Sequence, residues 1–325
     1  MKKLNLALML LGLSSASAFA GGIDYQEPEE SGVFIMGIEA LYVQPTGSDF
    51  VYGIQNNSTV QIDPSYDWGY HVDLGYAMPG NGPDFNLGYT HLSSEESENR
   101  ADISAATFGP ILNGYNSTNP LDAPNFGDAD GAARAKTEYD YTDIDLLIGK
   151  EFVLQNRYHF HPFAGVRYAD IESKDSAIYT VSGEILGSGE IKNEFDGIGP
   201  RAGIDAAMEI TKGFSFTARA AGSLLIGNYD YKATVNNVGN VGTAASATLK
   251  NSSENITVPE IDYRLGLNYT HEFSSETSLG VELGWTTVKY IDVMDRSIAR
   301  SANTSGSMSD WGFQGPYLRL QANIA

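Results

Sequence analysis

His71 and Asp73 stand two positions apart in a chain of 325 residues, and this spacing is the most suggestive of chemistry. In a strand, side chains two positions apart point to the same face. A histidine beside a carboxylate on the same face of a strand can serve as a general base. The spacing of the other residues specifies no nucleophile and no second acid, so we predict that the protein is not an enzyme. A hydrolase that uses this pair is kept as an alternative.

Composition narrows the other chemistry. The chain has no cysteine, which excludes disulfides, thiolate metal sites and a thiol nucleophile. The acidic segment at 121–131, LDAPNFGDADG, lacks the spacing and the closing glutamate of a calcium loop, and it is predicted to be a solvated surface loop. The formal net charge of −21 argues against nucleic acid as a partner, because nucleic-acid binding needs a basic face. We predict no cofactor and no metal.

Charged residues alternate with apolar residues in several segments. In FDGIGPRAGIDAAMEI (195–210), three glycines crowd together as they do in a nucleotide-binding loop. A phosphate loop would be followed by an amphipathic helix, whereas here the alternation continues through Gly203 to Ile210. The segment is therefore predicted to be a strand with Arg201 and Asp205 on its polar face. The same phasing places a set of charges on the inner side of a barrel: Arg167, Arg201, Arg219, Arg264, Arg319, Asp73, Asp205, Glu209, Glu260, Asp262 and Glu282.

Two interpretations of these inward charges stay open. They line a water-filled pore and bias its ions, with the excess of acids predicting a weak cation preference. Alternatively, the arginines and acids pair across the lumen and hold a narrow barrel shut. The many glycines on the same face favour open space, and a small general pore is the predicted function. The alternative function is a plugged structural or adhesive barrel that acts through loops around 95–137, 174–193 and 229–257.

These charges must be positioned by strands, because period-two alternation dominates the chain. In DWGYHVDLGYAM, the aromatic and apolar residues from Trp68 to Met78 fall on one face, and small or polar residues fall on the other. Ten such segments are predicted, at 33–44, 67–78, 84–94, 139–150, 158–171, 195–210, 214–227, 259–271, 278–290 and 311–324.

The connections between these segments alternate strictly between short and long. The longest runs from about Glu95 to Glu138, whereas TKG at 211–213 is one of the short ones. An up-and-down β-barrel of an outer membrane has this asymmetry, with short periplasmic turns and long extracellular loops. We predict an all-β antiparallel barrel of ten strands, with twelve as the alternative. A soluble sandwich or a lipocalin-like barrel is disfavoured, since neither has a reason to sort its loops by length.

The first twenty residues have the basic start, short apolar run and small-residue end of a cleaved signal peptide. Residues 1–20 are thus predicted to direct export, and residues 21–325 to form one barrel domain in the bacterial outer membrane. The apolar run is too short to span a bilayer as a helix. The expected partners are outer membrane lipid and lipopolysaccharide, small solutes and ions, with a non-covalent homo-oligomer left open.

Several segments, in order along the chain, resemble the Legionella-type major outer membrane protein family. They are GIEALYVQP (37–45), WGYHVDLGY (68–76), YDYTDIDLLIGKEF (139–152), PFAGVRYADI (162–171), FDGIGPRAGID (195–205), GSLLIGNY (222–229) and GPYLRL (315–320). The resemblance implies an outer membrane β-barrel, a porin-like channel and surface loops that meet host cells. The chain departs from members at the centre of the family in having no cysteine for covalent oligomers, and from many outer membrane barrels in not ending on an aromatic residue.

Overall fold

The computed structural model describes residues 31–47, 50–56, 58–80, 82–103, 105–106, 131–155, 157–237, 245–274, 277–295 and 308–325. The predicted signal peptide and most of the acidic segment at 121–131 lie outside these residues. Within the described ranges, no helix has the length and apolar character needed to cross a membrane.

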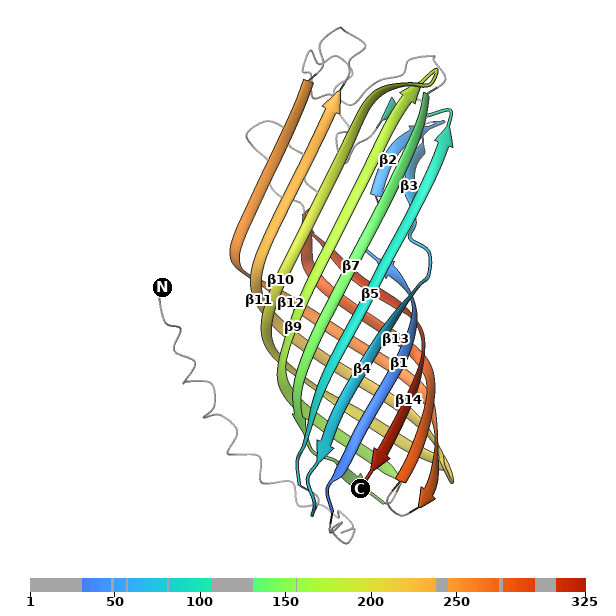
Figure 1. Ribbon diagram of the computed structural model, residues 1–325, viewed down its shortest axis with the longest axis vertical. Helices are drawn as coiled ribbons and strands as arrows, with labels where there is room; N and C mark the ends of the chain where they lie inside the picture. Colours follow the sequence, from blue (N-terminus) through green and yellow to red (C-terminus); the bar gives the residue numbers. More distant parts are fainter. Residues whose placement is uncertain are drawn as a thin grey trace.

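Ten antiparallel strands close into one barrel, as predicted (Figure 1). Each strand pairs with its neighbour along the barrel, and β14 pairs with β1 to close the wall. The alternative of twelve barrel strands is wrong. The barrel strands are β1 (Val33–Thr46), β4 (Asp67–Ala77), β5 (Asp84–Ala101), β7 (Gly131–Gly149), β9 (Tyr158–Val181), β10 (Glu184–Thr211), β11 (Phe214–Asn237), β12 (Ala245–Ser274), β13 (Thr277–Asp295) and β14 (Met308–Ile324).

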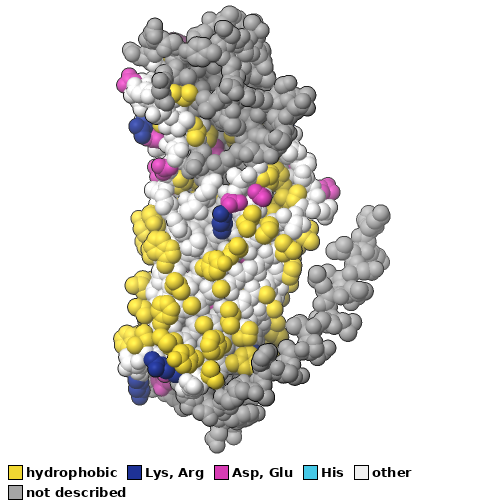
Figure 2. Space-filling view, turned by 180° about the vertical axis from the view of Figure 1, so that it is seen from behind, with side chains coloured by type: hydrophobic (Ala, Val, Ile, Leu, Met, Phe, Trp, Pro, Cys, Tyr) yellow, Lys and Arg dark blue, Asp and Glu magenta, His cyan; other side chains and the backbone are white. Residues whose placement is uncertain are grey.

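The outer face of the lower barrel is apolar (Figure 2). Leu283 is 61% exposed and Trp68 is 69% exposed, although both are large apolar side chains. Aromatic residues border this band: Trp68 and Trp285 near one end, Tyr269 and Phe214 near the other. A protein surrounded by water does not cover itself in this way. The band and its aromatic borders instead match the lipid-facing surface of a membrane barrel.

The barrel wall is much higher on one side than on the other. Six strands continue beyond the apolar band: β5, β7, β9, β10, β11 and β12. Their neighbours on either side are shorter. The pairing of β4 with β5 ends at Leu92 of β5, and the pairing of β13 with β12 ends at Glu260 of β12. The segments 174–193 and 229–257 were predicted to be long loops, and this is wrong for most of their length. β9 and β10 run on to a two-residue turn at Ser182 and Gly183, where Gly183 has a φ of +86°.

These extensions are strands because the sequence keeps alternating above the membrane with a different polarity. Apolar residues there face inward and charges face outward, which reverses the arrangement in the lipid band. About twelve residues separate Asp170 from the turn. At about 3.3 Å per residue and a tilt near 40°, the hairpin rises about 30 Å above the band.

The chain between β1 and β4 folds back into the high wall. It forms the hairpin β2 (Phe50–Gln55) and β3 (Ser58–Ile62), and β2 also pairs with β6 (Ala105–Ala106). At the opposite end, the predicted short turn at 151–157 contains β8 (Phe152–Leu154), which pairs with β9. In barrels of this kind the short turns face the periplasm, so the hairpin β2–β3 belongs to the extracellular half.

Candidate functional site: the closed interior

The centre of the barrel holds a buried cluster of ion pairs between β7, β9, β10 and β12. Arg201 donates hydrogen bonds to Glu260 at 3.0 Å and to Asp262 at 2.6 Å. Arg167 donates to both carboxylate oxygens of Asp145, at 2.8 and 2.6 Å, and to Glu260 at 3.0 Å. Glu260 therefore receives two arginines from two different strands. All five residues are at most 5% exposed, so solvent does not reach the cluster.

A second pair of arginines ties the two ends of the chain together. Arg264 of β12 donates to both carboxylate oxygens of Glu39 on β1, at 3.1 and 2.9 Å. Arg319 of β14 donates to Asp73 of β4 at 3.0 Å. Glu39 also lies directly opposite Arg319 across the β1–β14 seam, with 3.9 Å between the carboxylate and the guanidinium, so the two pairs adjoin.

A third group lies toward the periplasmic end. Arg219 donates to Asp205 at 2.5 Å and 2.9 Å. His161 lies between that carboxylate, at 3.5 Å, and Asp84, at 2.7 Å. Glu209 has the inward phase that the sequence predicts, yet its side chain is 52% exposed and is 3.9 Å from His159. Glu209 thus belongs to the open mouth of the barrel and not to the closed part.

Aromatic side chains cover the ion pairs on the extracellular side. The Tyr141 hydroxyl donates to Asp143 at 2.5 Å and lies 2.8 Å from the Tyr290 hydroxyl. Trp311 and Phe313 lie against Tyr141, each with a ring-centroid separation of 5.3 Å. Rings from β7, β13 and β14 therefore meet inside the barrel.

The hairpin β2–β3 closes the extracellular half above these rings. Tyr52 is fully buried, and its backbone oxygen accepts a hydrogen bond from the Tyr179 hydroxyl at 2.6 Å. The Tyr52 hydroxyl donates to Glu98 at 2.9 Å. Burial, together with the neighbouring Glu98 carboxylate, raises the pKa of Tyr52 well above its usual value. The phenol thus stays protonated as a donor and anchors the hairpin to β5.

Most inward glycines do not provide open space, which corrects the expectation from the sequence. A Cβ on Gly203 would lie 2.6 Å from the Phe163 ring, and one on Gly266 would lie 2.7 Å from the Tyr317 hydroxyl. These positions are glycine because large side chains from neighbouring strands occupy the space.

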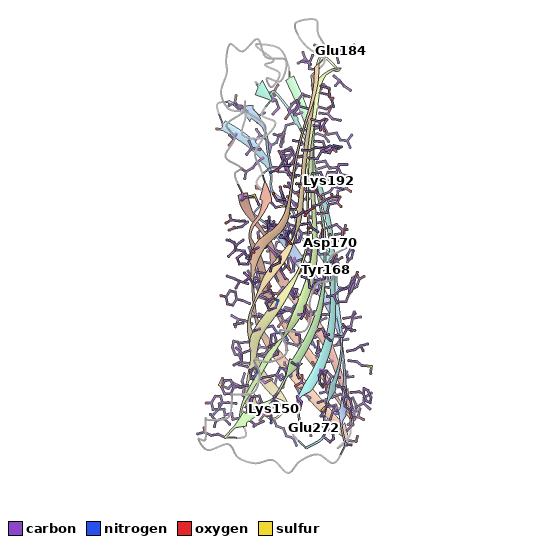
Figure 3. All side chains as sticks on the ribbon, turned by 90° about the vertical axis from the view of Figure 1, so that its left-hand side faces the viewer. Lys150, Tyr168, Asp170, Glu184, Lys192 and Glu272 are labelled. Atoms are coloured by element: carbon purple, nitrogen blue, oxygen red, sulfur yellow. The ribbon has the colours of Figure 1, made fainter. Side chains whose placement is uncertain are left out.

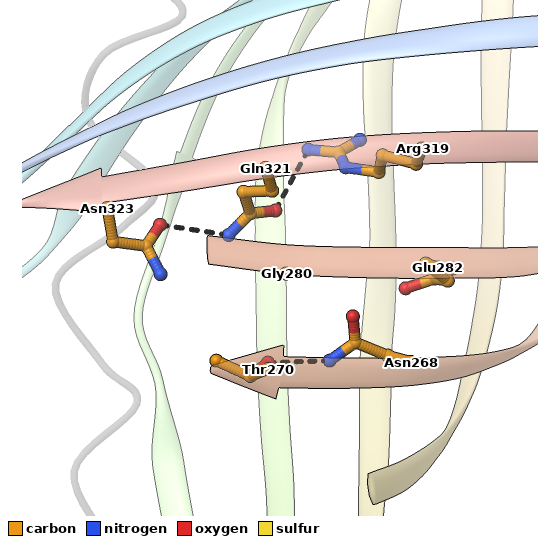
Figure 4. A pocket seen from close by; sticks show the side chains of 7 residues that line it. All are labelled: Asn268, Thr270, Gly280, Glu282, Arg319, Gln321 and Asn323. Carbon is orange, nitrogen blue, oxygen red and sulfur yellow. Dashed lines mark hydrogen bonds between the residues drawn. The ribbon is translucent and has the colours of Figure 1, made fainter. Parts of the chain in front are cut away.

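A polar cavity of about 80 Å³ remains near the periplasmic mouth (Figure 4). It is lined by Asn268, Thr270, Gly280, Glu282, Arg319, Gln321 and Asn323.

The histidine singled out by the sequence lies inside the barrel wall, not at an accessible rim. His71 is 7% exposed, with Nδ1 at 2.9 Å from the Thr90 hydroxyl and Nε2 at 3.6 Å from Asp73. The interaction between His161 and Asp84 was not predicted from the sequence. The alternation along a strand shows which face a side chain lies on, but it does not show which residue it meets across the lumen. Among the described residues, no group of three or more His, Asp or Glu side chains is arranged to hold a metal ion.

Of the eleven predicted interior residues, ten form this closed assembly or line its cavity. Glu282 accepts a hydrogen bond from Tyr317 and also lines the polar cavity. Whether any of the eleven lines a conducting pore stays a prediction.

A family model described as the Legionella pneumophila major outer membrane protein precursor matches residues 26–324. No curated protein matches the chain.

Two solved structures illustrate the general likeness. The outer membrane protease OmpT from Escherichia coli is 12% identical, with a TM-score of 0.46, over 93% of this chain and 99% of that one. A major outer membrane protein from Thermus thermophilus is 13% identical, with a TM-score of 0.30, over 90% and 98%. At these identities the likeness concerns the fold alone.

Proposed function

The chain belongs to the family of the Legionella pneumophila major outer membrane protein, and from that premise we propose that it is a closed outer membrane barrel that acts through its extracellular wall. The barrel anchors the protein, and the high wall formed by β5, β7, β9, β10, β11 and β12 presents a surface for attachment. This is the second of the two functions that the sequence left open.

The burial of the interior charges is the observation that carries the proposal. In a water-filled lumen, the lining charges remain accessible to solvent, whereas Arg201, Glu260 and Asp262 are only 1–2% exposed. Ten strands sit just above the eight-stranded size whose interior side chains can fill. The ion pairs, the aromatic layer and the hairpin β2–β3 are three successive barriers along the axis.

Planar-bilayer recording tests the closed state. The refolded protein is expected to give no discrete conductance steps, under conditions where a general porin inserted from the same detergent conducts. Regular steps of uniform size from the wild-type protein would contradict the proposal.

The attachment role is tested by shortening the β9–β10 hairpin. Deleting 176–181 together with 184–190 keeps the pairing of Asp175 with Ile191 and retains the Ser182–Gly183 turn. Cells displaying the shortened protein are expected to adhere less to a host-cell layer than cells displaying equal amounts of the wild type. Equal adhesion would show that the high wall is not the attachment surface.

A gated channel is the second candidate, and the polar cavity at the periplasmic mouth supports it. Arg319 and Glu282 line this cavity, so water and small ions would meet charge on entering from the periplasm. If conductance is observed, the excess of acids predicts a weak cation preference. Replacing Glu260 with Gln and Asp262 with Asn should then shift the reversal potential, and an unchanged potential would refute cation selection by these residues.

A further inference from the structure

Strand register brings four lysines side by side on the outer face of the high wall. Lys174 of β9 is directly opposite Lys192 of β10, which is opposite Lys232 of β11, which is opposite Lys250 of β12. Directly opposed side chains in adjacent strands have Cβ atoms about 4.5–5.5 Å apart, and like charges at that distance are destabilising. We call these four residues the lysine row.

The lysine row stands above the lipid band. Along β9, Tyr168 is followed by Asp170 and then by the row, and Figure 3 places Lys192 beyond Asp170 and Tyr168 along the barrel axis. On β11 the last outward apolar residue is Ile226, six residues before Lys232. At about 3.3 Å per residue and a tilt near 40°, the row lies about 15 Å above the end of the band.

The two halves of the lysine row differ in their partners. Lys192 lies 3.0 Å from Glu172 and also pairs with Glu194, and Lys174 lies 3.5 Å from Glu190. Within the described part of the chain, no carboxylate lies at ion-pair distance from Lys232 or Lys250, and both side chains are exposed.

The surroundings of these two lysines offer hydroxyl groups. Thr234 and Thr248 lie one row farther out, with their hydroxyls 3.3 Å apart. One row nearer the membrane, Asp230 lies between Ser252 and Glu194. Two neighbouring cations with no carboxylate at ion-pair distance, beside hydroxyl donors, suit an anion with several acceptor oxygens.

We propose that Lys232 and Lys250, with Lys192 beside them, bind phosphate groups on the inner sugars of the outer-leaflet glycolipid. A glycolipid of the outer leaflet carries its sugars above the lipid band, which is where the lysine row lies on the wall. Lysine binds phosphate as a point charge. Between the lysine row and the lipid band the outward face carries two rows of facing carboxylates, Glu194 with Asp230 and Asp196 with Asp170, which repel phosphates at the base of the lipid. The sugar phosphates are therefore the part that this surface selects.

Binding to purified lipopolysaccharide tests the site. The full chain is refolded in detergent, and its affinity for a lipopolysaccharide with a phosphorylated inner core is measured by microscale thermophoresis. The double variant Lys232→Gln/Lys250→Gln should bind about 30-fold more weakly, because each lysine near an anionic surface contributes about a factor of five. The control Lys150→Gln, at the periplasmic end in Figure 3, should bind as the wild type does.

Three further binding measurements distinguish the phosphates of the core sugars from those of lipid A and from free phosphate. Lipid A without its core sugars, and the same lipopolysaccharide after removal of its phosphates, should not distinguish the double variant from the wild type. Inorganic phosphate at 10 mM should not compete. An equal loss in Lys150→Gln, the same 30-fold difference with lipid A, or full competition by inorganic phosphate would each overturn the proposal. The shift in gel mobility between folded and heated protein verifies that each variant is folded.

Discussion

Replacing Arg201 with Met is the sharpest test of the closed interior. The guanidinium donates to Glu260, Asp262 and the Ser223 hydroxyl, the last at 3.2 Å. Removing one partner from a buried ion pair costs about 3–5 kcal/mol, because the remaining charge stays desolvated. Arg167 still reaches Glu260 at 3.0 Å, and Arg264 lies 3.7 Å from Asp262. These remaining contacts place the expected loss at the lower end, about 3 kcal/mol.

The free energy of unfolding can be measured by urea titration of the protein refolded into lipid vesicles, with folded and unfolded forms separated on a gel. Lys289→Met is a matched control, because it removes an ion pair to Asp310 whose side chains are 54% and 35% exposed. An exposed pair contributes about 0–1 kcal/mol. The double variant Arg201→Met/Asp262→Asn should recover part of the loss. If Arg201→Met cost no more than Lys289→Met, the interior charges would be hydrated and the barrel open.

The remaining predictions concern the lipid face, the hairpin and the topology. Leu283→Arg should lower the free energy of unfolding by about 2–4 kcal/mol, while Thr287→Arg, nearer the interface, should cost under about 1 kcal/mol; equal costs would contradict the assignment of the lipid band. Tyr52→Phe should loosen the hairpin β2–β3 by about 1.5–3 kcal/mol, seen as faster protease cleavage within residues 47–66, and unchanged cleavage would argue against the Glu98 anchor. A peptide tag inserted between Ser182 and Gly183 should be labelled by antibody on intact cells, whereas a tag next to Lys150 should be labelled only after the outer membrane is permeabilised.

The barrel could be predicted from the sequence because lipid imposes a simple rule on each strand. From Leu279 to Trp285 every second residue is apolar, and the structure places β13 at Thr277–Asp295. The outer parts of β9 and β10 were missed for the same reason. Once these strands leave the lipid, their outward residues become charged, as at Lys174 and Lys192, and the pattern looks like a polar loop.

The closure of the interior could not be predicted from alternation. Phasing correctly placed Arg201 and Glu260 on the inner face, but it gave no distance across the lumen. The glycines also suggested open space in the lumen. In the structure, the Phe163 ring lies against Gly203 and the Tyr317 hydroxyl lies against Gly266, so this space is occupied. The hairpin β2–β3 was also missed, because its fit depends on Tyr179, which is 127 residues away from Tyr52.

The ion pairs across the barrel have a consequence for how the chain inserts into a membrane. Arg264 pairs with Glu39 over a separation of 225 residues, and Arg319 pairs with Asp73 over 246 residues. A half-formed barrel would hold these charges against lipid without their partners, at a cost of several kcal/mol for each ion. Strands added one at a time would therefore accumulate an energetic penalty that is relieved only when β14 meets β1. Insertion is expected to be concerted, with the transition state reached only as the seam closes.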